Sequence, residues 1–214
     1  QYDSETLGRD AHIGDLLLAQ FGNYNKTIQI VVDCTTISIV NYKEILESKY
    51  IIGQNLKFDL QWLYNYSIVP RKVYDTMIVE QFLYLGYPPE YKDPINGISY
   101  SLQAIAQRRL NIYIDKSIRG EIQWRGIDKE VIEYAANDVV YLYDIMRSQI
   151  KDCKTKNCII GAKLECDFVP LIAYMEWCGI HLDESKWKDK MKTDKKNLDK
   201  SIEDLKRYVC NHPN

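Results

Sequence analysis

Short apolar runs separated by turn signals fill the first quarter of the chain. Residues 16–21 and 27–33 are rich in Leu, Ile and Val, and Gly, Asn and Tyr fill residues 22–25 between them. This pattern predicts two strands joined by a hairpin turn. Residues 51–53 are typical of a short buried strand that ends at a glycine. We therefore expect several strands before most of the helices.

Later segments carry apolar residues at steps of three and four, the spacing of one helix face. Such patterns cover residues 58–66, 76–85 and, as one long helix, 129–146. Ser101 is a good N-cap for a further helix that runs through Leu110. Residues 86–97 contain three prolines and two glycines, so we expect a loop there. Strands followed by mixed strands and helices predict a three-layer α/β domain.

The last quarter of the chain predicts two more helices. Residues 151–157 are polar and are interpreted as a linker. Leu164, Phe168, Leu171 and Met175 then fall at steps of four, three and four, which predicts an amphipathic helix, with a bend at Pro170. Apolar residues repeat similarly through residues 184–209. We expect the two helices to pack as an antiparallel pair, because their apolar faces must be covered.

Length and charge set wide limits on function. The chain has 214 residues, enough for one full domain and a smaller element, and its formal net charge is −2. The charge gives no overall basic footprint for nucleic acid, but a local basic rim is compatible with it. Lys116, Arg119 and Arg125, with Trp124 among them, fit either a phosphate-facing rim or a solvated loop.

The cysteines and the apolar runs indicate the compartment. None of the six cysteines forms a CxxC pair or a zinc-like spacing, which favours free thiols in a reducing cytoplasm. No apolar run approaches the length that spans a membrane, and no signal peptide precedes the first acidic residues. We expect a cytoplasmic protein of a bacterial or phage-infected cell, without a membrane partner.

Four acidic residues suggest chemistry. Asp3 and Glu5 are two residues apart, so on a strand both project from one face. Asp138 follows Tyr134 by four residues and shares its helix face, and Asp59 lies in an otherwise apolar segment. Neighbouring carboxylates resist joint ionisation unless a cation lies between them. Such a cluster is typical of oxygen ligation of Mg²⁺ or Mn²⁺.

Three motifs in order carry a family resemblance. Residues 3–6 (DSET), 53–59 (GQNLKFD) and 134–138 (YAAND) resemble the motifs of the DEDD superfamily of 3′→5′ exonucleases, tyrosine subclass. The chain is most similar to the proofreading domain of family A (polymerase I-like) DNA polymerases. The resemblance implies a ribonuclease H-like fold with a mixed five-stranded sheet over residues 1–151. It also implies that residues 158–214 are the helical start of a truncated polymerase region.

The resemblance also implies a cofactor and a set of site residues. Two divalent metal ions, Mg²⁺ or Mn²⁺, are expected. Asp3, Glu5 and Asp138 would hold one ion, Asp3 would bridge to the second, and Asp59 would support the second through water. Tyr134 would orient the attacking water. The residues expected to border the terminal nucleotides are Thr6, Leu7, Gln54, Asn55 and Phe58, with either Leu7 or Arg9 meeting the base.

The expected activity is removal of nucleotides from single-stranded or mispaired DNA 3′ ends as 5′-monophosphates, without polymerase activity in this segment. The expected partners are a single-stranded DNA 3′ end and the polymerase domain of the same full-length chain. Two alternatives stay open: a ribonuclease D-like RNA 3′ exonuclease, which uses the same motifs, and a non-catalytic single-strand-binding scaffold.

Overall fold

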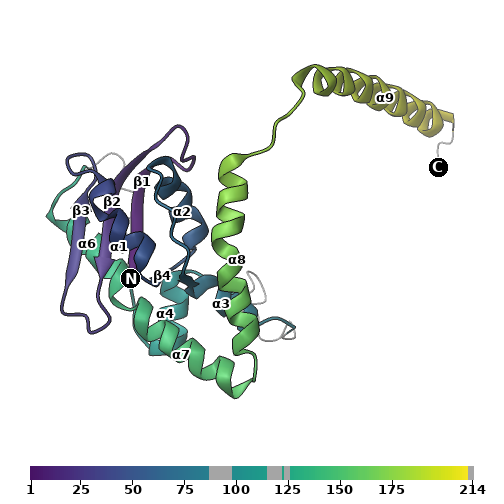
Figure 1. Ribbon diagram of the computed structural model, residues 1–214. Coiled ribbons are helices and arrows are strands. Elements are labelled where there is room, and N and C mark those ends of the chain that lie inside the picture. The colour runs from purple at the N-terminus through teal and green to yellow at the C-terminus, as the bar shows by residue number, and fades with distance from the viewer. Residues whose placement is uncertain (87–97, 115–121, 123–125, 212–214) are drawn as a thin grey trace. The chain divides into compact units, whose positions relative to one another are not determined.

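The computed structural model describes residues 1–86, 98–114, 122 and 126–211 (Figure 1). Residues 87–97 of the loop predicted over 86–97 lie outside the described residues, and so do Lys116, Arg119, Trp124 and Arg125. By their contacts the residues form two compact units, Gln1–Trp177 and Cys178–Asn214. All candidate site residues belong to the first unit.

The first sheet is an antiparallel meander that contains the predicted hairpin. Its strands are β1 (Tyr2–Leu7), β2 (Asp15–Gly22) and β3 (Gln29–Asp33), in the order β1-β2-β3. The register shifts between Glu5 and Thr6, a bulge-type irregularity that re-aims the end of β1. The motif that contains Asp3 and Glu5 is therefore built on the edge strand of this sheet.

The other two strands form a short parallel pair beside β1. They are β4 (Ile51–Gly53) and β5 (Val73–Asp75). Gly53 is needed at this junction, because a Cβ atom there would stand 2.9 Å from the carbonyl oxygen of Tyr2 and 2.3 Å from Leu56. The described residues thus contain five strands, antiparallel and parallel, hydrogen-bonded as sheets of three and two that meet between β1 and β4.

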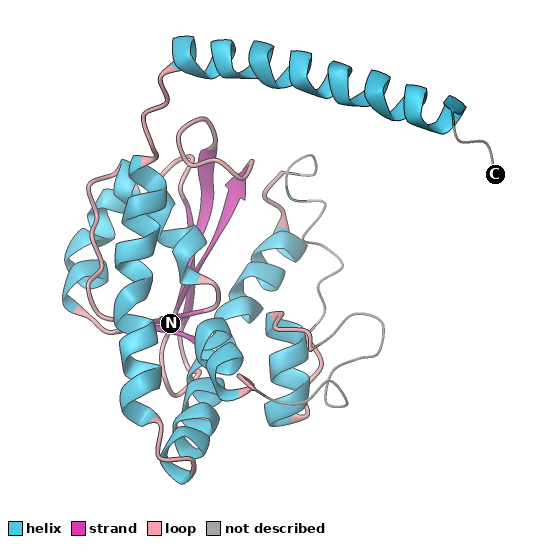
Figure 2. Ribbon diagram, turned by 90° about the vertical axis from the view of Figure 1, so that its right-hand side faces the viewer, coloured by secondary structure: helices cyan, strands magenta, loops and turns pink. Residues whose placement is uncertain are grey.

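Helices cover both faces of the strands (Figure 2). Ala19 of β2 packs into the cluster that contains residues of α1 and α2, whereas Leu18 packs with residues of α6 on the other face. This arrangement is the predicted three-layer α/β fold. In the part of the chain that the structure describes, the helices up to Cys178 are η1 (Ile39–Tyr42), α1 (Lys43–Ser48), α2 (Leu56–Asn65), α3 (Thr76–Leu83), α4 (Leu102–Leu110), α6 (Lys129–Val140), α7 (Leu142–Thr155) and α8 (Ile159–Cys178).

The long helix predicted over residues 129–146 is wrong in its extent. It ends at Tyr141 (φ −104°, ψ −5°), where α6 stops and α7 begins. No glycine or proline marks the break, and the apolar spacing continues across it. α7 then runs through most of the predicted linker and ends at Thr155, before Asn157 adopts a left-handed conformation (φ +53°). The linker is therefore a short turn.

The apolar stripe predicted on α8 faces solvent. Leu164 is 63% exposed, and Phe168, Leu171 and Met175 are exposed as well. The buried residues of α8 are the smaller Ala162, Cys166, Val169 and Ala173. The helix runs through Pro170, whose carbonyl accepts a hydrogen bond from the Tyr64 hydroxyl at 2.9 Å. α8 therefore packs as part of the first unit, through small residues that allow a close approach.

The second unit consists mainly of α9 (Glu184–Asn211), so both expected C-terminal helices are present. α9 buries none of its residues and carries ion pairs between side chains three and four positions apart, such as Lys190 with Asp194 at 2.8 Å. Among the described residues, no helix has the length and apolar character needed to cross a membrane.

Candidate active site

Three carboxylates from two elements meet at one point. The exposure along β1 alternates, so Tyr2 and Ser4 are buried while Asp3 and Glu5 turn together toward the opposite face. α6 lies across this sheet and brings Asp138 to the same place. Oxygen atoms of Asp3, Glu5 and Asp138 lie within 4.8 Å of one another. The period-two and helical spacings in the sequence thus identified residues that the fold brings together.

This donor set fits a divalent cation. Asp138 is 2% exposed, and ionised carboxylates so close together repel each other in a poorly solvated place. A cation between them removes that repulsion. Carboxylate oxygens are the ligands that Mg²⁺ and Mn²⁺ prefer, and sulfur or imidazole groups are not among the residues of this cluster.

Asp59 lies in the first turn of α2 and is separate from the group of three. It is almost fully buried and accepts a hydrogen bond of 2.5 Å from the Ser4 hydroxyl. Burial raises the pKa of Asp59 to about 7, while the Ser4 hydrogen bond opposes the rise and the charges of Asp75 and Glu5 add to it. Asp59 therefore contacts β1 through Ser4 and lines the same cleft as the three clustered carboxylates.

Asp75 shapes the turn that leads into α2. Its buried carboxylate accepts backbone hydrogen bonds from Asn55 at 3.0 Å and Leu56 at 2.7 Å, and from Met77 at 2.9 Å in α3. Asn55 is held in a left-handed conformation (φ +58°). Burial raises the pKa of Asp75, and the backbone hydrogen bonds counteract that effect. One carboxylate thus caps two helices, α2 and α3.

A cleft of about 900 Å³ adjoins the acidic residues. Four of the five expected substrate-binding residues line it, namely Thr6, Gln54, Asn55 and Phe58, whereas Leu7 does not. Arg9 does line it, so of the two candidates left open by the sequence the structure brings Arg9 to the cleft. Sequence reasoning missed the remaining lining residues, which are Ser4, Gly8, Met77, Tyr100, Ser101, Leu102, Gln103 and Ile122.

Tyr134 lies on the same helix as Asp138 but outside the lining of this cleft. Its ring is almost buried among Leu18, Ile122 and Val131, and it lines a neighbouring cavity of about 410 Å³ together with Glu130 and other residues. Its role in orienting water stays a prediction.

Comparison with known proteins identifies the family. A sequence profile of the 3′–5′ exonuclease family matches residues 1–151. The chain belongs to this family. The exonuclease is also 28% identical to DNA polymerase I of Aquifex aeolicus (strain VF5) over 224 residues, which cover 95% of this chain and 36% of that protein. The chain therefore spans about a third of the length of this curated relative.

Solved structures show where the fold recurs. Brucella melitensis NrnC superimposes with a TM-score of 0.70 at 22% identity, covering 83% of this chain and 84% of NrnC. NrnC with bound Mg²⁺ gives 0.67 at 21% identity, covering 85% and 88% of the two chains. Escherichia coli RNase D gives 0.67 at 22% identity, covering 88% and 47%. At these identities the likeness establishes the ribonuclease H-like exonuclease fold.

Proposed function

We propose that the chain is the metal-dependent proofreading exonuclease of a polymerase I-like enzyme. It would remove nucleotides from single-stranded or mispaired DNA 3′ ends as 5′-monophosphates. The observation that carries the proposal is the meeting of Asp3, Glu5 and Asp138 within 4.8 Å beside a cleft lined by amide and aromatic side chains. The match to DNA polymerase I over 95% of the chain supports DNA as the substrate.

Asp3, Glu5 and Asp138 would hold one divalent ion, and Asp59 would support a second ion through water, with Asp3 shared. When bound, the two ions supply positive charge for the phosphodiester and increase the acidity of a water molecule. The Ser4 hydroxyl holds the Asp59 carboxylate in place by its 2.5 Å hydrogen bond. Asp59 is thereby oriented before any ligand arrives.

The chain's other residues would bind and orient the strand. Phe58 offers a ring on which the terminal base can stack, and Thr6 and Asn55 offer polar groups along the same cleft. Arg9 adds a positive charge that suits a phosphate. Tyr134 precedes Asp138 by one helical turn, and its hydroxyl would orient water rather than remove a proton, because a phenol has a pKa near 10.

The second candidate is an RNA 3′ exonuclease, because RNase D and NrnC share the fold. Parallel assays on DNA and RNA single strands of the same sequence separate the two candidates. The non-catalytic scaffold is less well supported, because Asp3, Glu5, Asp59 and Asp138 all line one cleft.

The deciding experiment measures mononucleotide release from a 3′-labelled single strand with Mg²⁺, with Mn²⁺ and with chelator. Activity is expected only with metal, and Asp138→Asn should lower the rate by several orders of magnitude. Asp167→Asn is the matched control, since this exposed carboxylate lies on the surface of α8, where it pairs with Lys163. Equal rates for Asp138→Asn and the wild type would refute the metal assignment.

A further inference from the structure

One side of the cleft is formed by a segment that none of the three sequence motifs contains. Residues 100–103 line the cleft at the start of α4, and we call them the α4 wall. Ser101 caps α4 by accepting a hydrogen bond from the Ala104 amide at 3.2 Å. The position of this wall relative to the acidic residues sets the room that a strand has in the cleft.

The first tether of the α4 wall is Gln54. Its side-chain nitrogen Nε2 donates to the carbonyl oxygen of Tyr100 at 2.8 Å. Its oxygen Oε1 accepts from the Thr76 hydroxyl at 2.5 Å. A carbonyl can only accept, so the amide has one consistent orientation, with both ends engaged by protein groups. Gln54 thus joins the turn before α2 to the α4 wall.

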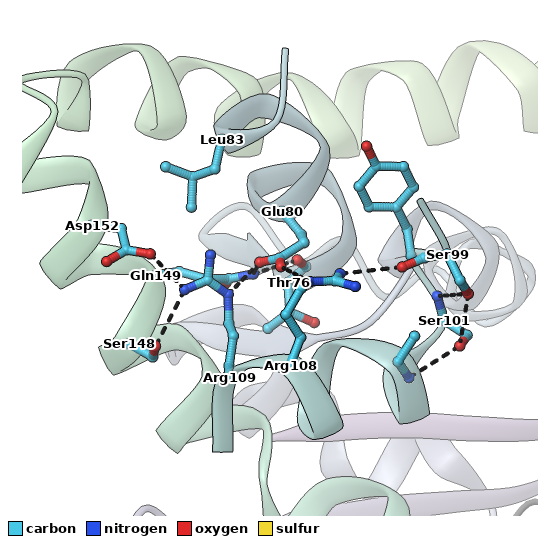
Figure 3. Close-up of polar contacts among 12 residues, drawn as sticks. Thr76, Glu80, Leu83, Ser99, Ser101, Arg108, Arg109, Ser148, Gln149 and Asp152 are labelled. Atoms are coloured by element: carbon cyan, nitrogen blue, oxygen red, sulfur yellow. Dashed lines mark hydrogen bonds and ion pairs between the residues drawn. The ribbon is translucent and has the colours of Figure 1, made fainter. Parts of the chain in front are cut away.

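The second tether is Arg108, on α4 itself. Its Nη2 donates to the carbonyl oxygen of Ser99 at 3.2 Å, and its Nε donates to the Glu80 carboxylate at 2.9 Å (Figure 3). Glu80 is fully buried and also accepts hydrogen bonds from Arg109 and from Gln149, the latter at 2.9 Å. Because three side chains hold this carboxylate, it is a fixed anchor for Arg108.

Both tethers end on α3. Thr76 begins this helix and Glu80 follows one turn later, and the Gln149 side chain donates to both, at 2.8 Å to the Thr76 carbonyl and 2.9 Å to Glu80. Figure 3 shows Arg108 of α4 and Gln149 of α7 converging on Glu80 of α3. Asp75, just before the helix, caps α2, the helix of Asp59. The α4 wall and the helix of Asp59 are therefore both held by α3 and by the residue directly before it.

We infer that Gln54 and Arg108 are positioning residues that hold the α4 wall at a set distance from the acidic cluster, so that a single strand is gripped in the cleft. This inference rests on the proposed function. It gives Gln54 a role that differs from direct contact with the terminal nucleotide. Neither tether contacts Asp3, Glu5 or Asp138 by the hydrogen bonds described above. Loosening the α4 wall should therefore weaken strand binding and leave metal binding unchanged.

The test compares Gln54→Met and Arg108→Ala with Gln107→Ala, a control on the same helix whose side chain contacts Asn111. In Arg108→Ala the Glu80 carboxylate keeps Arg109 and Gln149, so the fold should be retained. Each tether variant should raise KM for a single strand about tenfold, the upper end of what one hydrogen bond contributes, with kcat within about twofold. Mn²⁺ affinity should be unchanged, and the control should match the wild type.

Hydrogen exchange of the amides of residues 98–104, without substrate, gives a readout that does not need activity. Both tether variants should exchange faster there than the wild type. A higher KM without faster exchange would mean direct contact with the strand and would overturn the inference, as would faster exchange with an unchanged KM. If the wild type releases no nucleotide, the proposed function fails. In that case the exchange data, together with the Kd of a short single strand in place of KM, test whether Gln54 and Arg108 hold the α4 wall.

Discussion

Asp75→Ala should destabilise the first unit while it leaves every candidate metal ligand in place. The carboxylate of Asp75 accepts backbone hydrogen bonds at the starts of both α2 and α3. Loss of an N-cap costs about 0.5–2 kcal/mol per helix. Burial raises the pKa of Asp75, so desolvation of the carboxylate offsets part of the stabilisation that the caps contribute. We therefore take a contribution of about 1 kcal/mol per helix. The expected loss in the free energy of unfolding is about 2 kcal/mol.

Urea denaturation followed by tryptophan fluorescence measures this loss. For a slope of about 2 kcal/mol per molar urea, the midpoint should fall by about 1 M with the slope unchanged. Asp75→Asn is the matched control, since its side-chain oxygen can still accept from Asn55, Met77 and Ile78, while the Leu56 amide loses its acceptor. It should therefore lose less stability than Asp75→Ala. If the two variants unfold at the same midpoint as the wild type, the double cap does not stabilise the fold.

Three further predictions follow from the site and from α8. Saturating Mg²⁺ or Mn²⁺, at about a hundredfold excess over Kd, should raise Tm by about 5–10 °C, and scanning calorimetry should show this gain lost in Asp138→Asn. A chain that ends after Thr155 should fail to give a cooperative melting transition, because it lacks α8, whereas one that ends after Cys178 should melt cooperatively and cleave. Tyr134→Phe should lower kcat about 100-fold in steady-state assays, while titration calorimetry gives an unchanged Mn²⁺ affinity.

The faces that carry the acidic residues could be predicted from local spacing, whereas the meeting of Asp138 with Asp3 and Glu5, which are far away in the sequence, was expected from the family resemblance. A spacing of two on a strand fixes the shared face of Asp3 and Glu5, and the α6 pattern turns the Asp138 position inward. The hairpin and the Ser101 cap are local in the same sense and are confirmed. These features depend on a few neighbouring residues, so a single sequence is sufficient to predict them.

The α4 wall could not be predicted in this way. Tyr100 reaches the cleft through a hydrogen bond from Gln54, which is 46 residues away, and no spacing encodes that contact. The break at Tyr141 was missed for a related reason, because its sequence lacks a helix breaker and the apolar period continues past it. Asp75 had a visible signal, an acidic residue directly before a helical pattern, but its second helix became evident only in three dimensions.

The packing of α8 reverses the usual order of mutational tolerance along a helix. Its interior positions, Ala162 and Ala173, lie where added volume has to displace neighbouring side chains, and overpacking of this kind is itself destabilising. Several of its large apolar side chains, such as Phe168, lie outside and can be shortened at little cost to the first unit. A mutant library designed on hydrophobicity alone would keep the large exposed residues of α8, which tolerate substitution. It would vary the small buried residues, which do not.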